Sequence, residues 1–408
     1  MSFELKAKTA AGQKFVDAAE RLVPLLRRNA DRADREGAMS HVNFSALTEA
    51  GIPAAFVPEA LGGFGLASVH DWLVAIATIA RGDGSTAIAL NMHLGVSRGL
   101  ALAYHLAEQS GRSSEGLSLP LKAIADGRML ICATATERGT DNLHPFTTAT
   151  RTDEGWVING HKMFVTLSPL ATHIAMNLRM QDEEGDHLAT TMLPIDTPGI
   201  LPQDDWDALG MRGSGSQSVK FENVVTTESA VRKLGPWGRW STATLINRTL
   251  GNLTLVGAFF GIAQHAREIA LDAARTQKKL GEPVADSPGV QQTTGELEIE
   301  FARCRCVLLQ TGSDVDDWLA EAGSAPPTIE SAHQLMQAYQ AAKWTVNRGA
   351  IDIVSKAMDL AGGGGYMNTS PLARLYRDVR AGPFMQPHAA TEIRNYVGQV
   401  ALERYPDA

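Results

Sequence analysis

The feature that most constrains the fold is a change of hydrophobic pattern that occurs twice along the chain. Up to about Gly127, apolar residues recur at helical spacing, as in the run that begins at Phe15. From about Leu130, β-branched and polar residues alternate, as in TTATRTDEGWVINGHKMFVT (residues 147–166), which is typical of strands. Helical spacing returns from about Trp240. A chain with this order of patterns does not favour a single bundle or a single sheet.

We therefore expect three domains in the order helix, sheet, helix, with limits at residues 1–128, 129–236 and 237–408. A length of 408 residues agrees with two or three separate cores. Within the first helix, we expect Pro24 to kink or interrupt the chain, because proline lacks the N–H group that a helix interior uses.

Three turn signals predict hairpins in the middle domain. They are Asp153-Glu154-Gly155, Asn159-Gly160 and Glu184-Gly185, each of which lies between alternating segments. Glycine at such turns accepts the positive φ angle that short hairpin loops require. The sequence thus predicts hairpins within a β domain of roughly a hundred residues.

Charge, cysteine content and apolar runs argue against several classes of protein. The formal net charge is −8 without a basic stripe, so we expect neither nucleic acid nor a membrane as partner. Cys132, Cys304 and Cys306 cannot form a disulfide framework and lack a second ligand pair for zinc, which favours reduced thiols, a cytoplasmic location and no metal. The most apolar run, residues 253–263, is 11 residues long, short of the roughly 20 that span a bilayer, and predicts a buried helix.

Six stretches in order resemble the acyl-CoA dehydrogenase superfamily along nearly the whole chain. They are FVPEALGGFGL (56–66), GDGSTAIALNMH (82–93), CATATERGTD (132–141), GWVINGHKMFVT (155–166), ALGMRGSGSQSVKFENV (208–224) and AGGGGYMNTSPLARLYRDVR (361–380). The resemblance implies an N-terminal helical domain, a middle β-barrel domain and a C-terminal four-helix bundle. It also implies a homotetramer, a small-molecule substrate and a bound flavin.

Four residues are candidates for the wall of the flavin site. Thr134 and Thr136 alternate in sequence, so both hydroxyls can point to one side of a strand. Phe164 and Thr166 offer an aromatic face and a further donor in the stretch that follows Asn159-Gly160. A flavin ring needs a covered face and donors at N5 and its pyrimidine oxygens. Threonine and phenylalanine also favour strands, so without the resemblance they would be read as ordinary sheet residues.

The adenosine half of the cofactor is less well matched. The run Gly362, Gly363, Gly364 and Gly365 would let backbone approach a diphosphate, and Arg275 resembles the arginine that reaches the diphosphate in a neighbouring subunit. However, RTQKKLG lacks the aromatic residue of the family pattern, and Asp359 replaces a glutamine before the glycines. We therefore expect a flavin that is either FAD or FMN.

The catalytic carboxylate of the family is missing. Aligned forward from Arg377-Asp378, its position falls on Gln386, and aligned backward from Arg394 it falls on Pro387. Some relatives carry the base on an earlier helix, and that position corresponds to Gly251-Asn252. Neither place holds a group that accepts a proton at neutral pH, whereas removal of an α-proton from a thioester needs one.

Monooxygenases of the same fold dispense with the glutamate and handle protons with histidine, serine or asparagine while reduced flavin activates oxygen. The candidates for that work are Asn91, His93, Gln386 and His388, although His93 can equally be a packed helix residue. We therefore predict a flavin-dependent monooxygenase, which the resemblance pairs with a separate flavin reductase.

Three alternatives stay open. The first is acyl-CoA dehydrogenation with a displaced base, and the second is a flavin-binding protein without turnover. The third is a hydrolase built on Ser97 in Gly95-Val-Ser-Arg-Gly99, which matches the G-x-S-x-G pattern but lies in a predicted helix instead of after a strand.

Overall fold

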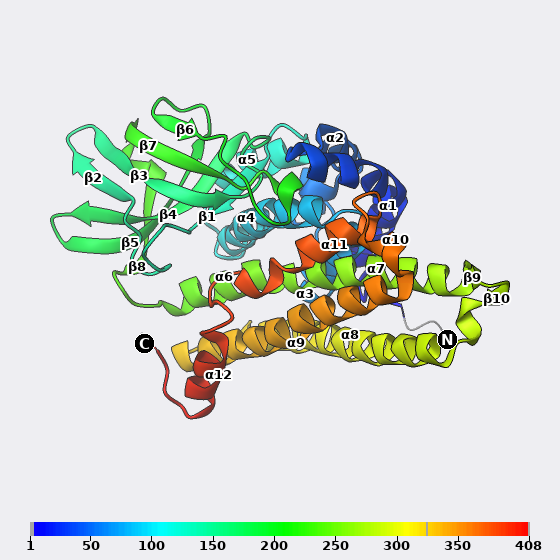
Figure 1. Cartoon of the computed structure of the whole chain (residues 1–408). Coiled ribbons are helices and arrows are strands. Elements are labelled where there is room, and N and C mark those ends of the chain that lie inside the picture. The colour runs from blue at the N-terminus through cyan, green and yellow to red at the C-terminus, as the bar shows by residue number, and fades with distance from the viewer. Residues whose placement is uncertain (1–3, 324, 407–408) are drawn as a thin grey trace.

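The computed structural model describes residues 4–323 and 325–406, which fold into helical, sheet and helical parts in the predicted order (Figure 1). The sheet occupies one end of the molecule, and the long C-terminal helices run beneath it and away from it. The N-terminal helices fill the angle between the two. The N-terminal elements are α1 (Ala10–Glu36), α2 (His41–Glu49), η1 (Ile52–Ala54), η2 (Glu59–Leu61), α3 (Val69–Gly82), α4 (Gly84–Gln109) and α5 (Glu115–Ala125).

Helix α1 begins at a threonine cap and continues through Pro24. The Thr9 side chain accepts a hydrogen bond from the Gly12 N–H group, which satisfies one of the free donors at the helix start. Phe15 and Leu26 are both fully buried, one on each side of Pro24. Of the predicted kink or interruption at Pro24, the interruption is therefore wrong, because the apolar face of α1 stays packed across the missing hydrogen bond.

The middle part is one eight-stranded sheet with the order β6-β7-β3-β2-β4-β5-β8, in which β1 also pairs with β4. The β1–β4 and β2–β4 pairs are parallel and the remaining pairs are antiparallel. The strands are β1 (Ile131–Thr134), β2 (Thr148–Thr152), β3 (Gly155–Val165), β4 (His173–Asp182), β5 (Gly185–Pro194), β6 (Ile200–Pro202), β7 (Gln217–Thr226) and β8 (Val231–Pro236), with η3 (Arg212–Ser214) and η4 (Glu228–Ala230) around β7.

Two of the three predicted reversals are present. Thr152 pairs with Gly155 across the β2–β3 turn, and Asp182 pairs with Gly185 across the β4–β5 turn. The reversal predicted at Asn159-Gly160 is wrong, because both residues lie inside β3, where the pairing with β7 has an irregularity. A Cβ atom at Gly160 would lie 2.3 Å from the hydroxyl oxygen of Thr147, so this glycine serves a close approach of backbone.

The C-terminal part contains the longest helices. Its elements are α6 (Thr242–Leu253), α7 (Leu255–Thr276), β9 (Lys278–Lys279), β10 (Glu282–Pro283), η5 (Val284–Asp286), α8 (Pro288–Ala322), α9 (Ile329–Ala361), α10 (Gly363–Tyr366), α11 (Pro371–Val379), η6 (Gly382–Phe384) and α12 (Ile393–Ala401). The segment Thr242–Thr276 is long and apolar enough to cross a membrane, but 72% of its most apolar window is buried inside the protein. Its apolar residues therefore serve the core, as predicted for residues 253–263.

Helices α3 and α7 cross closely through two glycines. A Cβ atom at Gly257 would lie 2.6 Å from the carbonyl oxygen of Leu73, and one at Gly261 would lie 2.2 Å from that of Ala77. The two glycines are four residues apart and share one face of α7. This contact fixes the C-terminal helices against the N-terminal ones.

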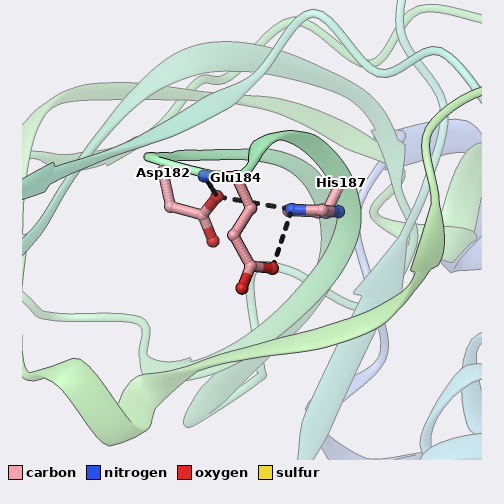
Figure 2. Close-up of side chains that lie close together, drawn as sticks. All are labelled: Asp182, Glu184 and His187. Atoms are coloured by element: carbon pink, nitrogen blue, oxygen red, sulfur yellow. Dashed lines mark hydrogen bonds and ion pairs between the residues drawn. The ribbon is translucent and has the colours of Figure 1, made fainter.

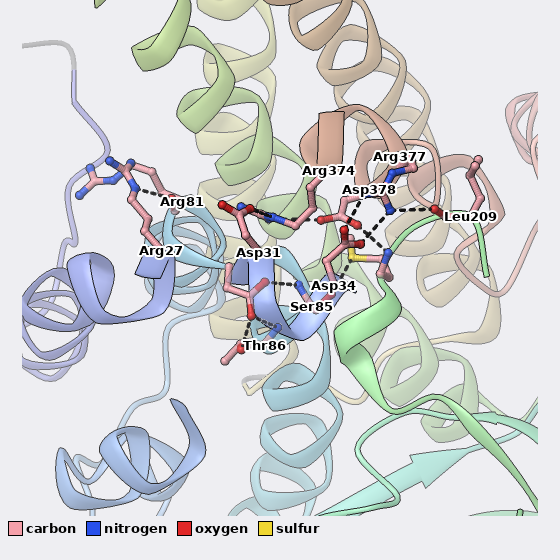
Figure 3. Close-up of polar contacts among 12 residues, drawn as sticks. Arg27, Asp31, Asp34, Arg81, Ser85, Thr86, Leu209, Arg374, Arg377 and Asp378 are labelled. Carbon is pink, nitrogen blue, oxygen red and sulfur yellow. Dashed lines mark hydrogen bonds and ion pairs between the residues drawn. The ribbon is translucent and has the colours of Figure 1, made fainter. Parts of the chain in front are cut away.

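A cluster of charged side chains joins all three parts of the chain (Figure 3). Arg377 of α11 donates to both carboxylate oxygens of Asp34 in α1, at 2.8 and 2.5 Å. Asp378 accepts the Met211 N–H group at 2.6 Å and lies 3.4 Å from Arg374. Burial raises the pKa of Asp378 to about 6. The cluster fixes the point from which the chain continues toward Gln386.

Candidate active site

The side chain of Gln386 reaches the sheet and donates a hydrogen bond to the hydroxyl of Thr136. Gln386 follows η6, whereas Thr136 lies two residues after the end of β1. The structure therefore brings together two of the predicted site residues, 250 positions apart in sequence. Because the Thr136 oxygen accepts this bond, its own proton remains available for a further acceptor.

One face of α9 holds the segment that carries Gln386. The Tyr339 hydroxyl donates to the Gln386 carbonyl at 2.7 Å, and the Lys343 ammonium group donates to the carbonyls of Met385 and His388. Asn347 donates to the carbonyl of Gly382 at 2.9 Å. The three donors follow one another at four-residue steps along the helix. Nothing in the local sequence of the segment indicates these partners.

The carboxylates that lie nearest in sequence to Thr136 and to Gln386 already have other partners. Glu137, which follows Thr136, is buried in an ion pair with Lys162 and also accepts the N–H groups of Phe146 and Thr147. Glu392, the next acid after Gln386, accepts the Ala389 N–H group at 2.8 Å. Among the described residues, no carboxylate is hydrogen-bonded to the side chain of Gln386 or Thr136.

Thr134 and Thr136 contact the same neighbouring strand but serve different partners. The Thr134 hydroxyl donates to the Met163 carbonyl at 3.0 Å, and the Met163 N–H group donates to the Thr136 carbonyl at 2.9 Å. These bonds place the end of β1 beside residue 164. The hydroxyl of Thr134 is thus occupied by backbone, whereas that of Thr136 faces Gln386.

Phe164 and Thr166 form the second part of the site. Phe164 has a φ of 52°, a strained conformation for a bulky residue, and its ring is 51% exposed and perpendicular to that of Trp206. The Thr166 hydroxyl lies 2.8 Å from that of Ser216, which lies 2.7 Å from that of Ser214. Trp206 and the two serines were not predicted as site residues, although SGSQS stands out in the fifth matching stretch.

His93 is buried with both ring nitrogens occupied by backbone. Its Nε2 atom lies 3.0 Å from the Pro53 carbonyl, and its Nδ1 atom accepts the Ile131 N–H group at 3.0 Å. The second bond requires an unprotonated Nδ1, so the ring is a neutral tautomer that donates from Nε2. Burial lowers the pKa of His93 to about 4. In this arrangement His93 holds the start of β1 against α4.

Asn91, two residues earlier in α4, also uses its side chain between helices. Its amide nitrogen donates to the Gly251 carbonyl at 3.1 Å, and its amide oxygen accepts the Thr254 hydroxyl at 2.8 Å. These two partners lie at the end of α6 and at the junction with α7. Asn91 thus joins α4 to the position where some relatives carry a base.

The structure shows no contact between the remaining predicted residues and the side chains of Gln386 and Thr136 among the described hydrogen bonds. The His388 ring stacks on Tyr396 at 4.3 Å, and burial lowers its pKa to about 4. Arg275 is the second-last residue of α7 and the glycine run 362–365 leads into α10; the end of α7 next to β9, and α10 itself, lie away from the sheet (Figure 1). Ser97 lies in the middle of α4 and does not follow a strand, contrary to what a nucleophile elbow requires.

A second polar cluster lies at the β4–β5 turn (Figure 2). Asp182, Glu184 and His187 place one ligand atom each within 4.8 Å of one another. The ammonium group of Lys233 lies 3.1 Å from Glu184 Oε2 and 3.1 Å from His187 Nε2. This group already supplies the positive charge that a metal ion would provide, so the cluster is an ion-pair network.

The geometry around Gln386 and Thr136 fits a flavin. A free hydroxyl proton at Thr136 and the Thr166 hydroxyl suit the acceptors of the ring, and the exposed ring of Phe164 can cover one face. The amide oxygen of Asn142, in the loop after Thr136, is buried without a hydrogen-bond partner within the described residues. These residues could therefore hold the ring, while the glycine run could approach a diphosphate.

Comparisons with known proteins agree along the chain. Residues 10–111, 131–224 and 248–386 match the N-terminal, middle and C-terminal domains of acyl-CoA dehydrogenase. The chain is 34% identical to an amino sugar nitrososynthase, DnmZ, of Streptomyces peucetius, over 97% of this chain and 95% of that protein. It is 32% identical to the L-evernosamine nitrososynthase of a Micromonospora species, over 97% and 91%.

A solved structure shares the whole architecture. The structure of KijD3 in complex with FMN and dTDP-3-amino-2,3,6-trideoxy-4-keto-3-methyl-D-glucose superposes with a TM-score of 0.89 at 30% identity. The match covers 98% of this chain and 96% of KijD3.

Proposed function

The chain belongs to the acyl-CoA dehydrogenase family, and from that premise we propose that it oxidises the amino group of an amino sugar with reduced flavin and oxygen. The protein is a flavin-dependent oxidoreductase that acts on a small molecule. The amino sugar is the proposed substrate because two relatives at 32% identity or more are named for that chemistry.

One observation supports oxygenation over dehydrogenation. Gln386 is one of the two positions aligned with the family's catalytic glutamate, the other being Pro387, and its amide donates to Thr136. An amide cannot take up the α-proton of a thioester, and Gly251, at the second possible position, has no side chain. Oxidation of an amine needs no such base, because the nitrogen lone pair itself is the nucleophile.

The exchange of glutamate for glutamine also changes what Thr136 can do. A glutamate would accept the hydroxyl proton of Thr136, whereas the glutamine amide leaves that proton free. We assign the free proton to an acceptor on the flavin ring. Thr166 adds a second hydroxyl, Phe164 covers one face of the ring, and Thr134 keeps the end of β1 in register through Met163.

A reduced flavin held by these residues would supply the two electrons with which O2 delivers one oxygen atom to the substrate nitrogen and the other to water. The amine thereby becomes a hydroxylamine, and a second reaction of the same kind followed by loss of water yields a nitroso group. The residues of this chain bind and orient the amine beside the ring and exclude bulk water. A neutral His93 keeps the α4–β1 junction closed, and Asn91 keeps α4 against α6.

We assign the remaining predicted residues to supporting roles. Gln386 directs Thr136, and His388 is proposed to move protons from beside Tyr396. Arg275 and Gly362 to Gly365 are proposed to bind the phosphate end of a flavin held by a neighbouring subunit, since they lie far from the sheet of their own subunit (Figure 1). This arrangement requires an oligomer, for which we propose a cytoplasmic homotetramer supplied with reduced flavin by a separate reductase.

The test is a reconstituted reaction with FMN, a flavin reductase, oxygen and a nucleotide-linked amino sugar. We expect the product to gain oxygen atoms that derive from labelled O2, as read by mass spectrometry. The matched control is the same nucleotide sugar with a hydroxyl in place of the amine. Absence of labelled product, or equal oxidation of the control, would contradict the proposed function.

A further inference from the structure

Arg248 is the one charged side chain on α6, in the otherwise neutral segment TATLINRTLGNL (242–253). Its Nε atom is buried without an acceptor, and no carboxylate of the described residues pairs with its guanidinium group. Burial lowers the pKa of Arg248 to about 10, so the group remains a cation at neutral pH. The residue as a whole keeps part of its surface accessible. A cation in this position lacks the partner that buried charges normally have.

The charges around Arg248 do not supply that partner. Lys162 of β3 is fully buried and forms an ion pair with Glu137, whose oxygens also accept two backbone N–H groups. Burial lowers the pKa of Lys162 to about 8; the attraction of Glu137 raises this pKa, and the repulsion from the charge of Arg248 lowers it. The Lys162–Glu137 pair is neutral as a unit, so the charge of Arg248 is left unbalanced.

Arg248 also lies beside the candidate active site. Lys162 precedes Phe164 by two residues, and Glu137 directly follows Thr136. One helical turn beyond Arg248 is Gly251, where an added Cβ would meet no atom within 4 Å. Helix α6 thus meets the candidate site one turn beyond Arg248, where the Gly251 carbonyl accepts a hydrogen bond from Asn91.

We infer that Arg248 binds the phosphate oxygens of a nucleoside diphosphate group on the substrate. A guanidinium group offers paired N–H donors that match two phosphate oxygens, and its attraction is strong where water is largely excluded. This inference rests on the proposed function, because it supplies the anchor for a nucleotide-linked amino sugar. For the amine to be oxidised at the flavin, the diphosphate of the substrate and the flavin ring must then occupy the two ends of one site.

The phosphate group of the flavin is a second candidate ligand for Arg248. Binding experiments distinguish it from the diphosphate of the substrate. Binding of dTDP and thymidine is measured with flavin-free protein, and binding of FMN and riboflavin is measured without nucleotide. Two variants are compared. Arg248→Met keeps a long side chain and removes its positive charge, whereas Arg248→Lys keeps the charge and loses the paired N–H donors of the guanidinium group. The control is Arg98→Met, since Arg98 is a half-buried arginine of α4 whose charge is attracted by Asp316.

We expect Arg248→Met to weaken dTDP binding by about tenfold or more, the loss typical of a charged hydrogen-bonding group, and to leave thymidine and FMN unchanged. Arg248→Lys should retain part of the affinity, and Arg98→Met should bind dTDP like the parent protein. The ligand-free Arg248→Met protein should melt at the same temperature or higher, because an unpaired buried charge has been removed.

Several results would overturn the inference. They are failure of the parent protein to bind dTDP, equal dTDP binding by Arg248→Met, a selective loss of FMN over riboflavin affinity, and a clear loss of thermal stability in Arg248→Met. Because the nucleotide is titrated without flavin, these results are independent of the oxidation assay. The proposed function can therefore fail while Arg248 binds diphosphate, and the reverse can also occur.

Discussion

The side-chain amide of Gln386 donates a hydrogen bond to the hydroxyl of Thr136, which joins the segment after η6 to the end of β1. Gln386 is one of the two residues, with Pro387, that the sequence aligns with the catalytic glutamate of a dehydrogenase. It also decides the direction of the Thr136 hydroxyl, because an oxygen that accepts from an amide has its own proton to give. Thr136 can therefore act as a hydrogen-bond donor at this site.

Saturated acyl-CoAs should not reduce the flavin of this protein. The α-proton of a thioester is a very weak acid, and no carboxylate of the described residues is hydrogen-bonded to Gln386 or Thr136 to remove it. The measurement is the visible flavin absorption after anaerobic mixing with acyl-CoAs of different chain lengths. Gln386→Glu serves as the matched variant, and rapid bleaching of the unmodified protein would contradict the oxygenase assignment.

Thr136→Val and Thr166→Val should each weaken flavin binding by about 1–2 kcal/mol, the usual contribution of one buried hydrogen bond. Valine keeps the shape of threonine and removes only the hydroxyl. Flavin fluorescence titration gives the affinity, and Thr152→Val, on an exposed part of β2, is the control. If the double variant Thr136→Val/Thr166→Val bound flavin normally, this placement of the ring would be wrong.

Discrimination between FAD and FMN should be weak. RTQKKLG (275–281) lacks an aromatic residue that could cover adenine, whereas Gly362, Gly363 and Gly364 remain open to a phosphate. Titration of flavin-free protein with both cofactors measures the difference. A preference for FAD above about a hundredfold, or about 2.8 kcal/mol, would show that the adenosine half is recognised after all.

The folded protein should lose stability as the pH falls from about 6.5 toward 4. Burial lowers the pKa of His93 to about 4 and that of His388 to about 4, while the unfolded chain binds protons near the ordinary value of 6.5. In this window the unfolded state holds more protons, so acid favours unfolding. Melting temperatures measured across the window should fall less steeply for His93→Gln than for the parent, whereas exposed His105→Gln should leave the slope unchanged.

Gly261→Ala should destabilise the protein by about 1–3 kcal/mol, because its methyl group would overlap the Ala77 carbonyl oxygen at the α3–α7 crossing. Gly295→Ala offers the matched control, since it lies in α8 with no atom within 4 Å of the added Cβ. That change should be neutral or stabilise by about 0.5–1 kcal/mol, as glycine costs conformational entropy in a helix. Denaturant unfolding compares the two variants, and equal stabilities would argue against a close crossing.

The sequence by itself determined the order of the three parts and most of the local elements. The apolar run 253–263 indicated a buried helix, and the turns at Asp153-Glu154-Gly155 and Glu184-Gly185 indicated hairpins, because these patterns depend on neighbours only a few residues apart. The same local reasoning failed at Asn159-Gly160. There the glycine accommodates Thr147 on the adjacent strand, a contact that the turn signal does not encode.

Only the tertiary structure decided how the candidate site is arranged. The sequence singled out both Gln386 and Thr136, but the hydrogen bond between them depends on the packing of α9 and on the charged cluster around Asp378. The sequence made His93 a candidate for proton transfer. In the fold, however, both of its ring nitrogens form hydrogen bonds with backbone groups. Arg248 is one arginine among many in the sequence, and it becomes distinctive only because burial leaves it without a partner. Such features depend on which distant groups a side chain meets, and periodicity along a chain carries no information about that.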